Sequence, residues 1–74
     1  MGKNGFRSDR LRELRERQGI SRMVLSELLG FGHDTIRKYE SGERAPRYNN
    51  LNTIAQHFGV PIAYFIGDDT SMGE

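Results

Sequence analysis

The sequence predicts a single all-α domain, a compact bundle of five helices. Apolar residues recur three or four positions apart, as in Leu11 and Leu14 or Leu25 and Leu29, which is the spacing of one helix face. Glycines follow several of these segments, and Gly30 stands where a helix would end and the next begin. A length of 74 residues suits one domain with a small core.

Each expected helix has a residue suited to one of its ends. Ser21 can cap a helix through its hydroxyl, Gly30 tolerates the positive φ of a tight turn, and Pro61 suits a first helical turn. We expect helices at 7–18, 22–29, 33–41 and from 49 or 50 to 58, with Asn49 or Asn50 as a cap, and a short fifth helix after Pro61 with Ile62, Phe65 and Ile66 pointing inward.

Basic residues are concentrated in the first two thirds of the chain. All eleven Lys and Arg residues lie in residues 1–47 with seven Asp and Glu residues, which gives that part a net charge of +4. Residues 48–74 contain only Asp68, Asp69 and Glu74 and carry −3. This asymmetry fits a polyanionic partner on the first part of the chain. A solvated helix surface is the alternative explanation.

Several classes of protein are disfavoured by composition. Without cysteine there is neither a disulfide framework nor a thiolate metal site, and neither His33 nor His57 has a spacing typical of a metal or catalytic site. No stretch approaches the ~18 apolar residues of a membrane span, and residues 1–5 lack the apolar run of a signal peptide. We therefore expect a cytoplasmic protein that is not an enzyme, binds no cofactor and does not contact a membrane.

The central segment, residues 21–42, carries a resemblance to a known family. Its matching residues are Ser21, Leu25, Ser26, Leu29, Gly30, Thr35, Ile36, Tyr39, Glu40 and Gly42. In order and spacing they resemble the helix-turn-helix of the phage Cro and repressor family, also called the XRE family. The likeness extends over residues 7–67. It implies a fold of the phage lambda repressor type and a nucleoid-associated bacterial or phage transcriptional regulator, a repressor by expectation, that binds double-stranded DNA as a homodimer on a near-palindromic operator.

The resemblance makes residues 33–41 the recognition helix, whose N-terminal end enters the major groove. The positions that then face bases hold His33, Asp34, Arg37 and Lys38. Lys38 or Arg37 suits guanine O6 and N7, and Asp34 suits the amino group of cytosine. Each of two residues has an alternative interpretation: for Asp34, a carboxylate that complements the helix N-terminus, and for His33, an ordinary exposed polar residue.

The resemblance also assigns phosphate contacts and one structural ion pair. The expected phosphate-binding residues are Ser21, Arg22, Thr35, Arg44 and Arg47. Arg22 stands where the family usually has glutamine, so it keeps a phosphate contact but not the brace to the recognition helix. Arg15 is expected to pair with Glu40, joining the first helix to the third.

Apolar residues also occupy positions where the family usually has polar ones. Met23, Val24 and Leu28 would give the second helix a second apolar face, which is either a contact surface for another protein or a set of scattered exposed side chains. The first interpretation supports a rival function, an antitoxin-like module that binds a partner protein. Ala63 and Tyr64 replace residues that are usually charged, and an exposed Tyr64 is our expected anchor of the dimer.

The ends of the chain are expected to lie outside the packed domain. Residues 1–6 are interpreted as a flexible N-terminus, and residues 68–74 as a disordered polar tail or the start of a linker to a further C-terminal domain.

Overall fold

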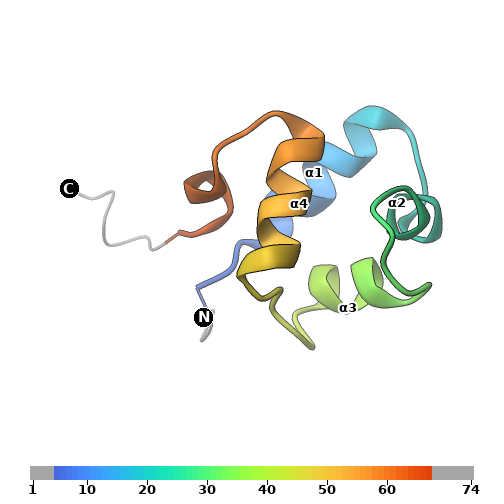
Figure 1. Cartoon of the computed structure of the whole chain (residues 1–74), viewed down its shortest axis with the longest axis horizontal. Coiled ribbons are helices and arrows are strands. Elements are labelled where there is room, and N and C mark those ends of the chain that lie inside the picture. Colours follow the sequence, from blue (N-terminus) through green and yellow to red (C-terminus); the bar gives the residue numbers. More distant parts are fainter. Residues whose placement is uncertain (1–4, 68–74) are drawn as a thin grey trace.

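Four α-helices and one short 3-10 helix build the fold (Figure 1). The computed structural model describes residues 5–67. Its elements are α1 (Ser8–Gln18), α2 (Arg22–Leu28), α3 (Thr35–Ser41), α4 (Tyr48–Phe58) and the 3-10 helix η1 (Ile62–Phe65). The all-α class is confirmed, but the five-helix bundle is corrected to four α-helices. The fifth segment is a 3-10 turn because only four residues separate Pro61 from Ile66, which pairs with Phe6.

Two predicted helix starts are corrected. Helix α3 begins at Thr35, and His33 and Asp34 form the turn before it. Helix α4 begins at Tyr48, so neither Asn49 nor Asn50 caps it. Instead the amide of Asn50 donates to the hydroxyl of Tyr39 at 3.0 Å, which ties α4 to α3.

The core is assembled from every helix. Leu11, Leu25, Ile36, Ile54 and Phe65 have almost no exposed surface and come from α1, α2, α3, α4 and η1 respectively. The α-helices have 7 or 11 residues, which is too short for a stable isolated helix, so each depends on packing one face into this shared core. The other buried apolar residues are Phe6, Tyr39, Leu51 and Ala55.

The residues before α1 pack against those after η1. Phe6 and Ile66 form an isolated antiparallel bridge, and the Arg7 N–H donates to the Phe65 carbonyl at 2.7 Å. The Phe6 ring is buried between Phe65 and Tyr39. Phe6 therefore belongs to the core, in contrast to the flexible 1–6 segment predicted from sequence.

Ile66 also differs from its prediction. Its side chain is 48 % exposed and lies outside the core cluster, although its backbone pairs with Phe6 in the isolated bridge. Residues 1–4 and the predicted tail at 68–74 lie outside the described residues. Within residues 5–67 no helix has both the length and the apolar character needed to cross a bilayer.

Candidate nucleic-acid interface

Hydrogen bonds define the start of α2 and the turn that joins α2 to α3. The Ser21 hydroxyl caps α2 by accepting from the Val24 N–H at 3.0 Å. After α2 the chain turns through Gly30 at φ +78°, a left-handed conformation that favours glycine. The Phe31 N–H then donates to the Ser26 carbonyl at 2.8 Å. The predicted cap and positive φ are both present.

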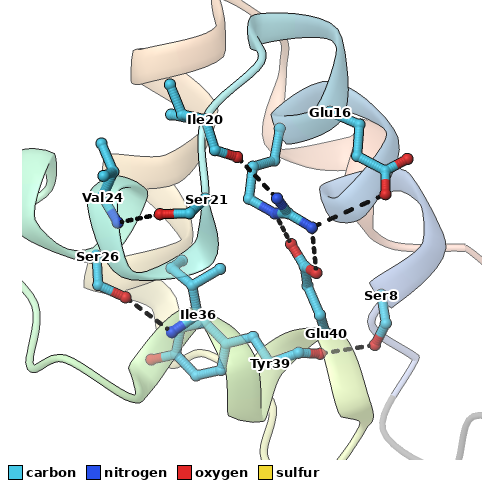
Figure 2. A network of polar contacts seen from close by, with 10 residues as sticks. Ser8, Glu16, Ile20, Ser21, Val24, Ser26, Ile36, Tyr39 and Glu40 are labelled. Atoms are coloured by element: carbon cyan, nitrogen blue, oxygen red, sulfur yellow. Dashed lines mark hydrogen bonds and ion pairs between the residues drawn. The ribbon is translucent and has the colours of Figure 1, made fainter.

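Ser26 is the point at which α2 holds α3. Its side chain is completely buried, and its hydroxyl accepts from the Ile36 N–H at 3.2 Å (Figure 2). That N–H lies in the first turn of α3, where no carbonyl of the same helix is available. Asp34 precedes the helix but its side chain makes no capping hydrogen bond. Ser26 of the neighbouring helix α2 therefore satisfies an N–H group that a capping side chain would otherwise satisfy.

Arg15 and Glu40 connect α1 to the far end of α3. Arg15 Nε donates to Glu40 Oε2 at 2.6 Å and Nη2 donates to Oε1 at 3.1 Å, while Nη1 donates to the Ile20 carbonyl at 2.8 Å (Figure 2). The side chains are only 11 % and 2 % exposed. These hydrogen bonds, which Arg15 donates to the Glu40 carboxylate, raise the pKa of Arg15. The ion pair implied by the resemblance is thus a bidentate, buried contact.

Further contacts complete the fixation of α3. The Ser8 hydroxyl of α1 donates to the Tyr39 carbonyl at 2.8 Å (Figure 2). The ring of Tyr39 lies edge-on to Phe6 and to Phe31. Polar and apolar contacts from α1, α2, α4 and the N-terminal segment thus fix the inner face of α3, which leaves its outer face in a defined orientation.

The four residues predicted to read bases lie in the turn before α3 and on the outer face of α3. His33 and Asp34 are exposed, and Arg37 and Lys38 are partly exposed on α3. Three of them (His33, Asp34 and Arg37) line a common surface hollow with Ser21, Arg22 and Met23 of the α2 start. The N-terminal ends of α2 and α3 therefore lie on the same surface of the domain.

Two of these residues bind each other. Arg37 Nε donates to Asp34 Oδ1 at 2.7 Å and Arg37 Nη2 donates to Asp34 Oδ2 at 2.8 Å. The hydrogen bonds from Arg37 hold the pKa of Asp34 below its usual value and raise the pKa of Arg37. On the other side, Arg37 Nη1 lies 3.4 Å from Glu43 Oε2. Asp34 directly precedes α3 and Arg37 follows three residues later, a spacing at the start of a helix that could have revealed their contact from sequence.

Glu43 is the residue that sequence reasoning missed. It lies beyond Gly42, whose φ of +86° ends α3, so helical spacing gives no hint that Glu43 returns to Arg37. Its approach depends on the path of the loop after the helix.

The predicted phosphate-binding residues lie on three segments around this face. Ser21 and Arg22 are exposed at the start of α2, Thr35 is the first residue of α3, and Arg44 and Arg47 are exposed in the loop between α3 and α4. Across residues 5–67, no ion pair involves Arg22, Arg44 or Arg47. Their charges are therefore not neutralised by a carboxylate in contact.

The comparison with known families matches this arrangement. A family model described as a helix-turn-helix domain covers residues 8–63, which include all four α-helices and the α2–α3 surface. The chain belongs to this helix-turn-helix family. It is an XRE-like helix-turn-helix DNA-binding domain.

Relatives of this helix-turn-helix domain come from distant organisms. It is 29 % identical over 68 residues to the cryptic phage CTXphi transcriptional repressor RstR of Vibrio cholerae, covering 90 % of this chain and 61 % of the relative. It is 36 % identical over 64 residues to an uncharacterized HTH-type transcriptional regulator of Sinorhizobium medicae, covering 86 % and 46 %.

A third relative is longer still. Identity to a putative HTH-type transcriptional regulatory protein of Pyrococcus furiosus is 49 % over 54 residues, which cover 73 % of this chain and 17 % of the relative. The chain therefore spans less than two thirds of each of these relatives. No solved structure matches it significantly.

The helix-turn-helix domain also exposes apolar side chains on α2. Met23, Val24 and Leu28 are 53 %, 41 % and 60 % exposed. Val24 and Leu28 are four residues apart and share one face, whereas Met23 lines the hollow with Arg22 and His33. The predicted apolar set is thus split between the α2–α3 surface and a separate face.

Tyr64 is less accessible than predicted. The Arg10 guanidinium lies 4.8 Å from the centre of its ring, and Arg10 Nη1 donates to the Tyr64 carbonyl at 2.8 Å. The ring also lies edge-on to Phe65. Ala63 is exposed, as is Ile66. The exposed tyrosine anchor is therefore corrected to a partly buried ring covered by Arg10 of α1.

Proposed function

We propose that the chain is the sequence-reading module of a transcriptional regulator, a repressor by preference, that binds double-stranded DNA in the cytoplasm of a bacterium or of a phage-infected cell. The observation that carries this proposal is the outer face of α3, which carries Arg37 and Lys38. Contacts with α1, α2 and α4 hold the opposite face of this helix, and Arg22 of α2 lines the same hollow as Arg37. The naming of relatives as transcriptional regulators supports it.

Phosphate contacts would set the position of the domain on the duplex. Ser21, Arg22 and Thr35 lie at the N-terminal ends of α2 and α3, where N–H groups without helical partners favour anions. Arg44 and Arg47 would bind the backbone beyond α3. Such contacts supply affinity and register but no sequence preference.

Base contacts would come from residues that lie among these phosphate-binding side chains on the same surface. With α3 in the major groove, His33, Asp34, Arg37 and Lys38 face the base edges. Lys38 forms no ion pair with any residue of 5–67, so its ammonium can bind guanine O6 and N7 without breaking an internal pair.

A homodimer would place two copies of α3 one DNA turn apart, ~34 Å, on a near-palindromic operator. The exposed Ala63 and Ile66, next to the partly buried Tyr64, are the proposed contact between the copies. Occupying the operator would repress transcription by blocking polymerase.

The first test is selection of bound duplexes from a random pool with the purified chain. An enriched inverted repeat is expected, and affinity should fall steeply as salt rises, because each phosphate contact releases counterions. A flat salt response, or retention of random sequence only, would contradict the proposal.

Lys38→Ala provides the sharper test of base reading. It should relax the preference at one base position by ~1–3 kcal/mol. Arg12→Ala is the matched control, because Arg12 is an exposed cation of α1 without an ion pair within residues 5–67. Equal weakening on every sequence would make Lys38 a phosphate contact instead.

A second candidate function is binding of a partner protein in the manner of an antitoxin. The exposed Val24 and Leu28, which share a face of α2, favour it. Leu28→Lys should then abolish partner binding and leave DNA binding intact, whereas Lys38→Ala with Arg44→Ala should do the reverse. Loss of both activities in either variant would contradict two separate surfaces.

A further inference from the structure

Asp34 and Arg37 are not independent of each other in the structure. The carboxylate of Asp34 occupies the edge of the Arg37 guanidinium formed by Nε and Nη2, with two contacts of 2.7 and 2.8 Å. Both oxygens of Asp34 are used. Each oxygen can still accept a second hydrogen bond, but a base amino group would have to share that oxygen with the Arg37 guanidinium.

A guanidinium has a second edge that can bind two acceptors at once. It is formed by Nη1 and Nη2, which carry two hydrogens each. Asp34 accepts one hydrogen of Nη2 and Glu43 accepts one of Nη1, so one N–H on each nitrogen remains for a further acceptor. Glu43 Oε2 approaches Nη1 at 3.4 Å. Asp34 and Glu43 thus hold the group from two sides and limit its rotation.

The remaining N–H groups of Nη1 and Nη2 suit the pair of acceptors that only one base presents. Guanine presents O6 and N7 side by side in the major groove, and two parallel N–H groups bind them with good geometry, whereas adenine, cytosine and thymine do not offer this pair of acceptors. An arginine that is already oriented loses less side-chain freedom on binding than a mobile one.

We propose, on the basis of the function proposed above, that Asp34 is a positioning residue that orients Arg37 to read one guanine, and that Asp34 does not itself read a base. The assignment makes Asp34 and Arg37 a single recognition unit. It leaves the neighbouring Lys38 as a separate reader.

Asp34 can be changed without removing a helix cap, because its side chain makes no capping hydrogen bond to α3. Asp34→Ala should therefore fold with an unchanged thermal midpoint by circular dichroism. Asp34→Asn is the second variant. Its amide retains one acceptor but places an N–H₂ against an Arg37 N–H, so it should lose the orientation as well.

The experiment repeats the duplex selection with the unchanged chain and with Asp34→Ala, Asp34→Asn, Arg37→Ala and the Asp34→Ala/Arg37→Ala double variant. Each Asp34 variant and Arg37→Ala should lose preference for guanine at the same position, by ~10- to 100-fold. The double variant should lose no more than Arg37→Ala alone, because Asp34 acts through Arg37.

Glu13→Ala is the matched control. Glu13 pairs with Arg17 at 3.0 Å on the exposed surface of α1, so its removal changes the net charge by the same amount as Asp34→Ala. Its selected sequence should equal that of the unchanged chain.

Three outcomes would overturn the inference while leaving the proposed function intact. Asp34 variants could lose preference at a different position from Arg37→Ala, they could retain the full guanine preference, or Arg37→Ala could weaken all sequences equally. If the unchanged chain selects no sequence, the proposed function itself fails, and the inference with it.

Discussion

At the residue scale, Arg15 and Glu40 illustrate how an ion pair can fix two helices. Glu40 is 2 % exposed and receives both of its hydrogen bonds from Arg15, whereas Arg15 also binds the Ile20 carbonyl and lies 3.9 Å from Glu16. The two partners therefore depend on each other unequally. Removing Arg15 leaves a buried carboxylate alone, but removing Glu40 leaves a guanidinium with other acceptors.

Arg15→Ala should consequently destabilise the domain more than Glu40→Ala does. The loss for Arg15→Ala is about 3–5 kcal/mol, the usual cost of an uncompensated buried charge. Urea unfolding followed by circular dichroism measures both values. Arg17→Ala, which breaks the exposed pair with Glu13, is the control and should cost less than about 1 kcal/mol. Equal losses for the two buried partners would contradict the asymmetry.

At the element scale, α3 depends on its neighbours for its start and its orientation. It has seven residues, which is too short for an independent helix in water. The Ser26 hydroxyl of α2 satisfies the Ile36 N–H, the Ser8 hydroxyl of α1 binds the Tyr39 carbonyl, and Asn50 of α4 binds the Tyr39 hydroxyl. The angle of the reading surface is thus decided by three other helices.

Ser26→Ala tests this dependence. It leaves the Ile36 N–H buried without an acceptor, which should cost about 1–3 kcal/mol. Hydrogen exchange of the first turn of α3 should rise together with the loss of stability in urea unfolding. Ser41→Ala is the control, because the Ser41 hydroxyl bonds on the exposed surface, where water can replace it. Unchanged protection at Ile36 would show that Ser26 acts only by its small size.

At the scale of the whole molecule, the fold is closed by residues from its two ends. Phe6 is 8 % exposed between Tyr39 and Phe65, and its bridge to Ile66 connects the segment before α1 to the segment after η1. The contacts of Phe6 thus connect α3, the segment before α1 and the segment after η1. A small domain has little other apolar surface to compensate for its loss.

Phe6→Ala should therefore destabilise the whole domain by about 3 kcal/mol, the lower end of the range for phenylalanine in a core, because Phe6 lies at the border of the core. Thermal unfolding measures the effect. Tyr48→Ala, at an aromatic residue that is 68 % exposed, should leave the midpoint nearly unchanged. If neither substitution changed the thermal midpoint, Phe6 would not stabilise the core and would belong to the flexible segment predicted from sequence.

Several elements followed from local sequence signals. These signals depend on near neighbours in the chain, so they can be recognised without the tertiary structure. They are the Ser21 cap, the positive φ of Gly30 and the apolar positions of Leu11, Leu25 and Ile54 in their helices. The contact between Asp34 and Arg37 was not predicted from sequence, although it is equally local, because the residue before a helix lies beside the third residue of its first turn.

Other features were decided only by the tertiary structure. Three contacts join residues whose separation in sequence matches no helical period. Phe6 packs in the core, the Arg10 guanidinium lies over the Tyr64 ring, and Glu43 contacts Arg37. By itself the sequence determined the all-α class and the helix-turn-helix family, because these depend on periodicity and local turns. The packing of the ends and the orientation of the reading surface required the fold, because they arise from contacts between distant residues.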